Sequence, residues 1–95
     1  MADADSRFDW DDGNIEHIAR HGLEPFEAEE ALDDPHSFTY GVESKYEPRF
    51  VAVGSTQDGR VIAVVYTPRG RRLRVVTARR TVGWEIARYR RRGRK

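Results

Sequence analysis

The stretch Arg60–Arg80, RVIAVVYTPRGRRLRVVTARR, predicts two β-strands joined by a tight turn at Pro68–Gly70. The first strand, Val61–Tyr66, is a short apolar run rich in β-branched residues, which is typical of a strand covered on both faces. This hairpin is the most strongly patterned part of the chain, so the other elements are expected to pack around it.

The second strand of the hairpin carries cations on an otherwise apolar surface. Side chains alternate across a strand, so two sets of residues are expected on opposite faces. The sets are Leu73, Val75 and Thr77 on one face, and Arg72, Arg74, Val76 and Ala78 on the other. Further arginines stand at the turn and at the strand end: Arg69, Arg71, Arg79 and Arg80. Because like charges repel, anions must compensate this cluster, either the protein's own carboxylates or the phosphates of a ligand.

Length and composition predict one small domain spanning residues 1–95, with flexible tails at residues 1–7 and 91–95. The chain has no cysteine, which excludes disulfides and thiolate metal sites and fits a reducing compartment. No apolar run is long enough to span a bilayer, and the acidic start Met1–Ser6 does not resemble a secretory signal. These features predict a cytoplasmic protein without membrane contact.

The two halves of the chain carry opposite charge. Met1–Glu47 holds fourteen acidic and three basic residues, whereas Pro48–Lys95 holds two acidic and fourteen basic residues. Such asymmetry is typical of proteins that contact nucleic acid. It also fits a fold in which the acidic half neutralises the basic half, and both interpretations can hold together.

The N-terminal half predicts helices. Phe8–Trp10 could form a very short edge strand, and Asp11 or Asp12 could cap a helix over Asn14–Arg20 with Ile15, Ile18 and Ala19 as its apolar stripe. Gly22 suits the end of this helix, and Pro25 suits the first turn of a second helix that stops at Asp33-Asp34-Pro35.

The remainder of the chain is predicted to form mainly strands. Ser37–Tyr40 is a possible strand, Gly41–Pro48 a mobile loop, and Arg49–Ser55 a strand that reaches the hairpin through a turn at Asp58-Gly59. A last helix follows Thr81. The order predicts an α+β domain in which helices pack on one face of a three- to four-stranded antiparallel sheet and arginines occupy the other face.

The ordered motifs resemble the BrnT toxins along nearly the whole chain. In the first half they are Phe8-x-Trp10-Asp11, Asn14, His21-Gly22, Phe26-x-Ala28 and Asp33-Asp34-Pro35. In the second half they are Arg49-Phe50, Val65-x-Thr67-x-Arg69-Gly70, Arg74–Arg79, Glu85 and Arg88-Tyr89. The chain departs from the family pattern at Arg20, Thr77 and Ile86-Ala87, where BrnT toxins tend to have lysine, serine and arginines.

The resemblance implies a RelE-like fold and the toxin half of a type II toxin–antitoxin pair. It implies an endoribonuclease that inhibits translation and growth, cuts RNA without a metal or other cofactor, and is neutralised by a BrnA-like antitoxin. Operator DNA would be contacted only through the toxin–antitoxin complex.

Metal-free RNA cleavage needs a base for the 2′-OH, cations for the charge that develops at phosphorus, and an acid for the leaving oxygen. Arg69, Arg74 and Arg79 fall where the family's arginines do, and the planar guanidinium matches two phosphate oxygens. The alternative is surface charge paired with Glu27, Glu29 and Glu30. Additional arginines are candidates for RNA binding: Arg49, Arg72, Arg80 and Arg88.

Three residues are candidates for proton transfer. His21 could be the base or a helix-terminal histidine, Glu85 could be the base or a structural partner of Arg88, and Tyr89 could act on RNA or belong to the core. His17 and His21 have a spacing that can bind metal, but no third ligand accompanies them, so no metal site is predicted.

Two other classes of function fit the same residues. One is a non-catalytic module that binds RNA or an acidic protein segment. The other is a small structural domain whose halves merely neutralise each other.

Overall fold

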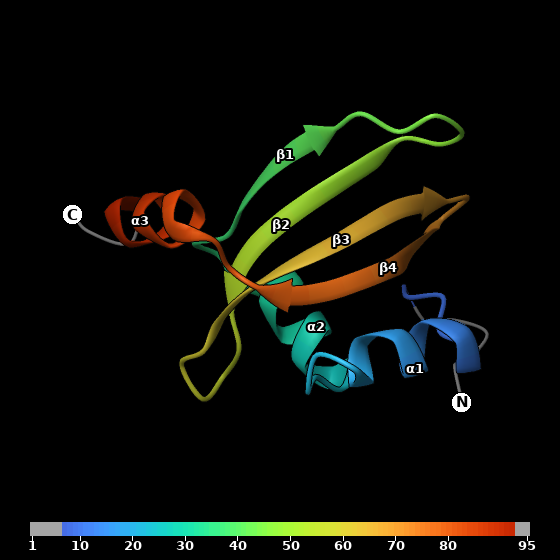
Figure 1. Ribbon diagram of the computed structural model, residues 1–95, viewed down its shortest axis with the longest axis horizontal. Coiled ribbons are helices and arrows are strands. Elements are labelled where there is room, and N and C mark those ends of the chain that lie inside the picture. Colours follow the sequence, from blue (N-terminus) through green and yellow to red (C-terminus); the bar gives the residue numbers. More distant parts are fainter. Residues whose placement is uncertain (1–6, 93–95) are drawn as a thin grey trace.

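The structure, a computed structural model, describes residues 7–92, which form three helices and four strands (Figure 1). In chain order these are α1 Asp12–Ala19, α2 Pro25–Asp33, β1 Phe38–Val42, β2 Arg49–Ser55, β3 Val61–Arg69, β4 Arg72–Arg80 and α3 Gly83–Arg92. The strands form one antiparallel sheet in the order β1-β2-β3-β4. The predicted α+β class is therefore confirmed, with four strands.

The β3–β4 turn lies later than predicted. Pro68 and Arg69 belong to β3, and the chain reverses at Gly70-Arg71, with Gly70 in the left-handed region at φ 59°. Proline is tolerated here because the pairing of β2 with β3 ends at Phe50 and Tyr66, so that β3 has β4 as its neighbour at Pro68.

Helices α1 and α2 cover one face of the sheet. They bury Ile18, Ala28 and Ala31 against Ile62 and Val64 of β3 and against β4. The approach of α2 to β2 is close enough to require glycine, because a Cβ at Gly54 would lie 2.2 Å from the carbonyl oxygen of Ala31. A second apolar cluster, which includes Phe38, Val51, Val53 and Ala63, lies on the opposite face.

β4 is irregular, so strict alternation predicted the faces of residues 72–75 correctly and those of Thr77 and Ala78 wrongly. Thr77 pairs with Val65 and Val75 pairs with Tyr66, so Val76 is an extra residue, as in a β-bulge. Val75 and Ala78 consequently both face the helices and join the same core cluster. Thr77 moves to the face opposite α1 and α2, which also carries Val53, Ala63 and Val65 and which we call the open face.

The N-terminal segment and α1 close the outer edge of β4. The predicted short strand over Phe8–Trp10 is reduced to a single parallel bridge between Phe8 and Leu73, and Phe8 is buried. Asp11 caps α1, and the buried side chain of Asn14 donates to the carbonyl oxygens of Asp9 at 2.9 Å and Val75 at 3.0 Å.

The predicted apolar stripe of α1 is only partly correct. Ile18 is fully buried, but Ala19, the last residue of α1, is exposed. The buried positions are Asn14 and Ile18, four residues apart on the side that faces β4.

Helix α3 lies at the opposite end of the sheet from the β3–β4 turn (Figure 1). It includes Arg91 and Arg92, which were expected in a flexible tail, and Arg92 donates to the carbonyl oxygens of His36 and Ser37. Arg7, from the other expected tail, is also described and pairs with Asp33 at 2.7 Å. The rest of the expected tails, residues 1–6 and 93–95, lies outside the described residues. Within residues 7–92, no helix is long and apolar enough to cross a bilayer.

Candidate functional site

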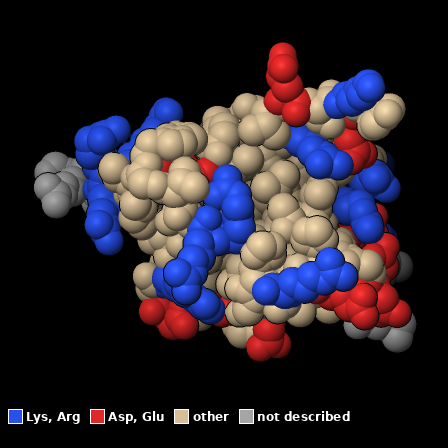
Figure 2. Space-filling model, viewed as in Figure 1, with Lys and Arg blue, Asp and Glu red and all other residues tan. Residues whose placement is uncertain are grey.

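Five of the candidate arginines share the open face. Arg79 pairs with Ala63, Arg74 with Thr67, and Arg72 with Arg69, and paired residues of antiparallel strands project to the same side. Arg49 shares this side with Val51 and Val53 by alternation along β2. Figure 2 shows Lys and Arg side chains bordering an uncharged area over the middle of the sheet, not gathered in one patch.

Acidic side chains compensate these arginines, but not the acids that the sequence suggested. Arg74 contacts Asp11 at 2.9 Å and Asp9 at 3.5 Å. The hydrogen bond from Arg74 holds the pKa of the Asp11 carboxyl below its ordinary value, and that of Arg74 is raised in turn. The α2 acids have other partners: Glu27 binds Arg60, Glu29 accepts from Trp10, and Glu30 accepts from the Gln57 backbone.

Glu47 lies between two arginines of the open face. Its carboxylate is 3.5 Å from Arg49 and 3.3 Å from Arg69. Both guanidinium groups remain substantially exposed, so solvent weakens these ion pairs and a phosphate could compete for either cation. Glu47 stands in the segment that was expected to be a mobile loop.

Glu47 borders a groove of about 240 Å³ that is also lined by residues of α1 and β4. We call it the His17 groove; its lining residues are Gly13, Asn14, His17, Glu47, Arg49, Arg74, Val75 and Val76. An imidazole, a carboxylate and two guanidinium groups therefore border one small space. In the sequence, His17 stood out only for a spacing that can bind metal, and Glu47 did not stand out at all, because segments about thirty residues apart meet here.

Arg79 and Glu85 form a separate group at the α3 end of the sheet. The Glu85 carboxylate is fully buried and accepts from both terminal nitrogens of Arg79 at 2.9 and 3.0 Å, from the Val82 backbone at 2.9 Å and from the Tyr40 hydroxyl. Burial alone would raise the pKa of Glu85, but the hydrogen bonds from Arg79, Tyr40 and Val82 outweigh it and lower the pKa. These hydrogen bonds are typical of a residue that stabilises the fold. The partner of Glu85 is Arg79, whereas the sequence suggested Arg88.

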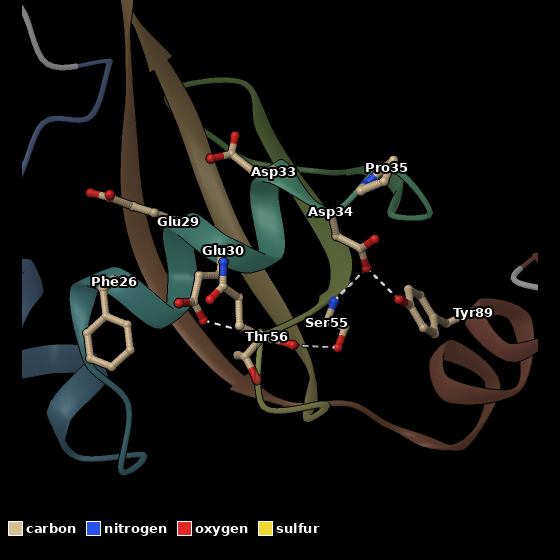
Figure 3. Close-up of a pocket in the computed structure, with 10 residues that line it drawn as sticks. Phe26, Glu29, Glu30, Asp33, Asp34, Pro35, Ser55, Thr56 and Tyr89 are labelled. Atoms are coloured by element: carbon tan, nitrogen blue, oxygen red, sulfur yellow. Dashed lines mark hydrogen bonds between the residues drawn. The ribbon is translucent and has the colours of Figure 1, made fainter.

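Tyr89 lies in a different setting. Its hydroxyl donates to Asp34, whose carboxylate also accepts from the Ser55 backbone at 2.8 Å (Figure 3). Burial, followed by the hydrogen bond to Asp34, raises the pKa of Tyr89 to about 12.

The cavity beside Tyr89 is acidic. It has a volume of about 580 Å³, and Figure 3 shows carboxylates from α2 and its C-terminal end around it. They belong to Glu29, Glu30, Asp33 and Asp34. A polyanion would be repelled here, so Tyr89 does not join the arginines of the open face.

His21 lies in a second groove, of about 540 Å³, with Arg60 and Arg80. No carboxylate lines this groove, and the Arg60 guanidinium is already paired with Glu27. The His17 and His21 rings are 6.1 Å apart, and within residues 7–92 no three potential metal ligands converge.

Arg88 of α3 places its guanidinium 4.8 Å from the centre of the Phe38 ring.

Comparison with known proteins places the chain in a family. Residues 10–83 match the model of a family described as the ribonuclease toxin BrnT of type II toxin–antitoxin systems. The chain belongs to the BrnT toxin family. BrnT proteins are ribonuclease toxins, which makes RNA the substrate class and an antitoxin the partner. No curated protein matches the chain.

The BrnT match includes some of the candidate residues and ends before others. It covers the His17 groove, His21, Arg69, Arg72, Arg79 and Arg80. It ends at Gly83, at the start of α3, so Glu85, Arg88 and Tyr89 lie beyond it.

Proposed function

We propose that this chain is a metal-independent endoribonuclease whose reaction takes place in the His17 groove. The groove is lined by a carboxylate, two guanidinium groups and an imidazole, which can supply the base, the cations and the acid that metal-free RNA cleavage needs. The His21 groove lacks a carboxylate, and the Glu85 and Tyr89 groups are held by other residues.

The four groups act together in one transesterification step. Glu47 takes the proton of the ribose 2′-OH, whose oxygen then attacks the adjacent phosphorus. Arg49 and Arg74 bind the phosphate oxygens and stabilise the charge that develops there. His17 gives a proton to the 5′-oxygen as its bond to phosphorus breaks. The products are a 2′,3′-cyclic phosphate and a 5′-hydroxyl.

The rest of the open face would hold the RNA backbone. Arg69 is about half exposed and lies next to Glu47, while Arg72 and Arg79 continue the same face along β4. Their charges suit a polyanion laid across the strands, which would displace the weak ion pairs at Glu47.

The cellular role follows from this activity. A BrnA-like antitoxin would cover the basic open face, the complex would contact operator DNA through the antitoxin, and the free toxin would slow growth in the cytoplasm by cutting RNA.

The purified chain, free of antitoxin, tests this proposal when it is incubated with RNA in EDTA. We expect fragments that end in a 2′,3′-cyclic phosphate. Binding of RNA without fragments would show a non-catalytic module, and absence of salt-dependent binding would show a structural domain.

A further inference from the structure

An aromatic cluster stands at the α3 end of the sheet, where the exposed Trp84 packs against Tyr40 and the buried Phe38. We propose that it is a stacking subsite for an unpaired RNA base. The Trp84 side chain is 50% exposed although it lies among aromatic rings. Its ring centre is 4.9 Å from that of Tyr40 and 6.2 Å from that of Phe38.

The rings beneath Trp84 are held in place. Phe38 is buried, and the Tyr40 hydroxyl donates to the buried carboxylate of Glu85. Trp84 therefore rests on a fixed surface and presents an aromatic side chain to solvent. A preorganised aromatic surface loses little side-chain freedom when a base stacks on it.

The charges around the cluster favour a nucleic acid over an apolar partner. Arg88 lies over the Phe38 ring, and Arg79 reaches the group from β4 while remaining about one-third exposed. Figure 2 shows further cations on this side of the molecule. Aromatic side chains interleaved with guanidinium groups are the common way in which proteins hold single-stranded RNA, since bases stack and phosphates pair.

The cluster also lies along the path of RNA required by the proposed function, on which this inference rests. Arg74 in the His17 groove and Arg79 beside the cluster are five residues apart on β4. Because Val76 is an extra residue, their partners Ala63 and Thr67 are only four residues apart on β3, and at a rise of about 3.3 Å per residue the two arginines are separated by about 13 Å. A short single strand bound at the groove would therefore reach Trp84 with a neighbouring base.

The test uses a short 2′-O-methyl RNA, which lacks the attacking hydroxyl and so reports binding independently of cleavage. We expect Trp84→Ala to weaken binding about tenfold, and Trp84→Phe to retain most of the affinity because a ring remains. The control is Val82→Ala, a neighbouring apolar residue that is 49% exposed, and it should bind like the wild type.

Tryptophan fluorescence gives a second readout. Titration with the same RNA should quench emission in the wild type, and Trp84→Phe, which keeps Trp10, should bind RNA without that quench. The inference is overturned if Trp84→Ala binds as tightly as Val82→Ala or if the quench persists in Trp84→Phe. Failure of the wild type to cleave ordinary RNA would instead count against the proposed function and leave the stacking result intact.

Discussion

Arg74 and Arg79 lie on the same face of β4 although they are five positions apart in the sequence. In a regular strand an odd spacing places side chains on opposite faces. The extra residue Val76 shifts the alternation by one, which brings Arg79 to the open face with Arg74 and turns Ala78 toward the helices. The bulge thus gives the sheet a row of guanidinium groups without exposing its core.

Arg79→Ala should destabilise the protein because it leaves the buried Glu85 carboxylate without its cation. Loss of one partner of a buried pair costs several kcal/mol, and since Arg79 is partly exposed we expect about 2–3 kcal/mol. Denaturant unfolding measures the change. The control Arg80→Ala removes an exposed neighbour and should cost less than about 0.5 kcal/mol. Equal losses in the two variants would refute the structural role of the Arg79–Glu85 pair.

Gly54→Ala should destabilise the contact between α2 and β2. The added Cβ would lie 2.2 Å from the carbonyl oxygen of Ala31, so the helix must move. Overpacking of this kind costs about 2–3 kcal/mol. Gly41→Ala is a matched control in β1, where a Cβ would meet only the Phe50 ring at 4.0 Å. Thermal unfolding should therefore separate the two variants clearly, and similar midpoints would contradict the close packing described for Gly54.

The phenol of Tyr89 should titrate late. Its pKa is raised from 10.0 to about 12, so the folded state holds this proton more tightly than the unfolded state. The stability that it contributes is fully present below pH 10 and is lost as the pH rises toward about 12. The ultraviolet absorbance of phenolate follows the titration of the tyrosines. The rise in absorbance at the highest pH should be missing in Tyr89→Phe. An unchanged rise in that variant would mean that Asp34 does not hold the hydroxyl.

Much of the fold could be predicted because its signals are local. The β-branched run of Val61–Tyr66, the turn at Asp58-Gly59 and the prolines and glycines at helix ends each constrain a few neighbouring residues. The bulge at Val76 could not be predicted, because Val75, Val76 and Thr77 are all good strand residues and none marks an extra position.

The candidate site depends on contacts between distant segments, which is why only part of it could be predicted. Arg49 and Arg74 were recognisable as cations at family positions, and the structure brings them to one groove. Glu47 was hidden in an exposed loop, and His17 drew attention only as a neighbour of His21. Tyr89 and Glu85 looked suitable for proton transfer, but neither periodicity nor charge could reveal that Asp34 and Arg79 hold them.

RNA cleavage in EDTA by His17→Ala and by His21→Ala shows which of the two grooves holds the reaction. His17 lies in the last turn of α1, His21 lies just beyond the end of that helix, and both are exposed, so the variants should fold alike. We predict that His17→Ala loses about 10²- to 10⁴-fold in cleavage rate, as expected for loss of a proton-transfer group, while His21→Ala cleaves like the wild type. Loss of cleavage in His21→Ala with full activity in His17→Ala would exclude the His17 groove and place the reaction in the His21 groove.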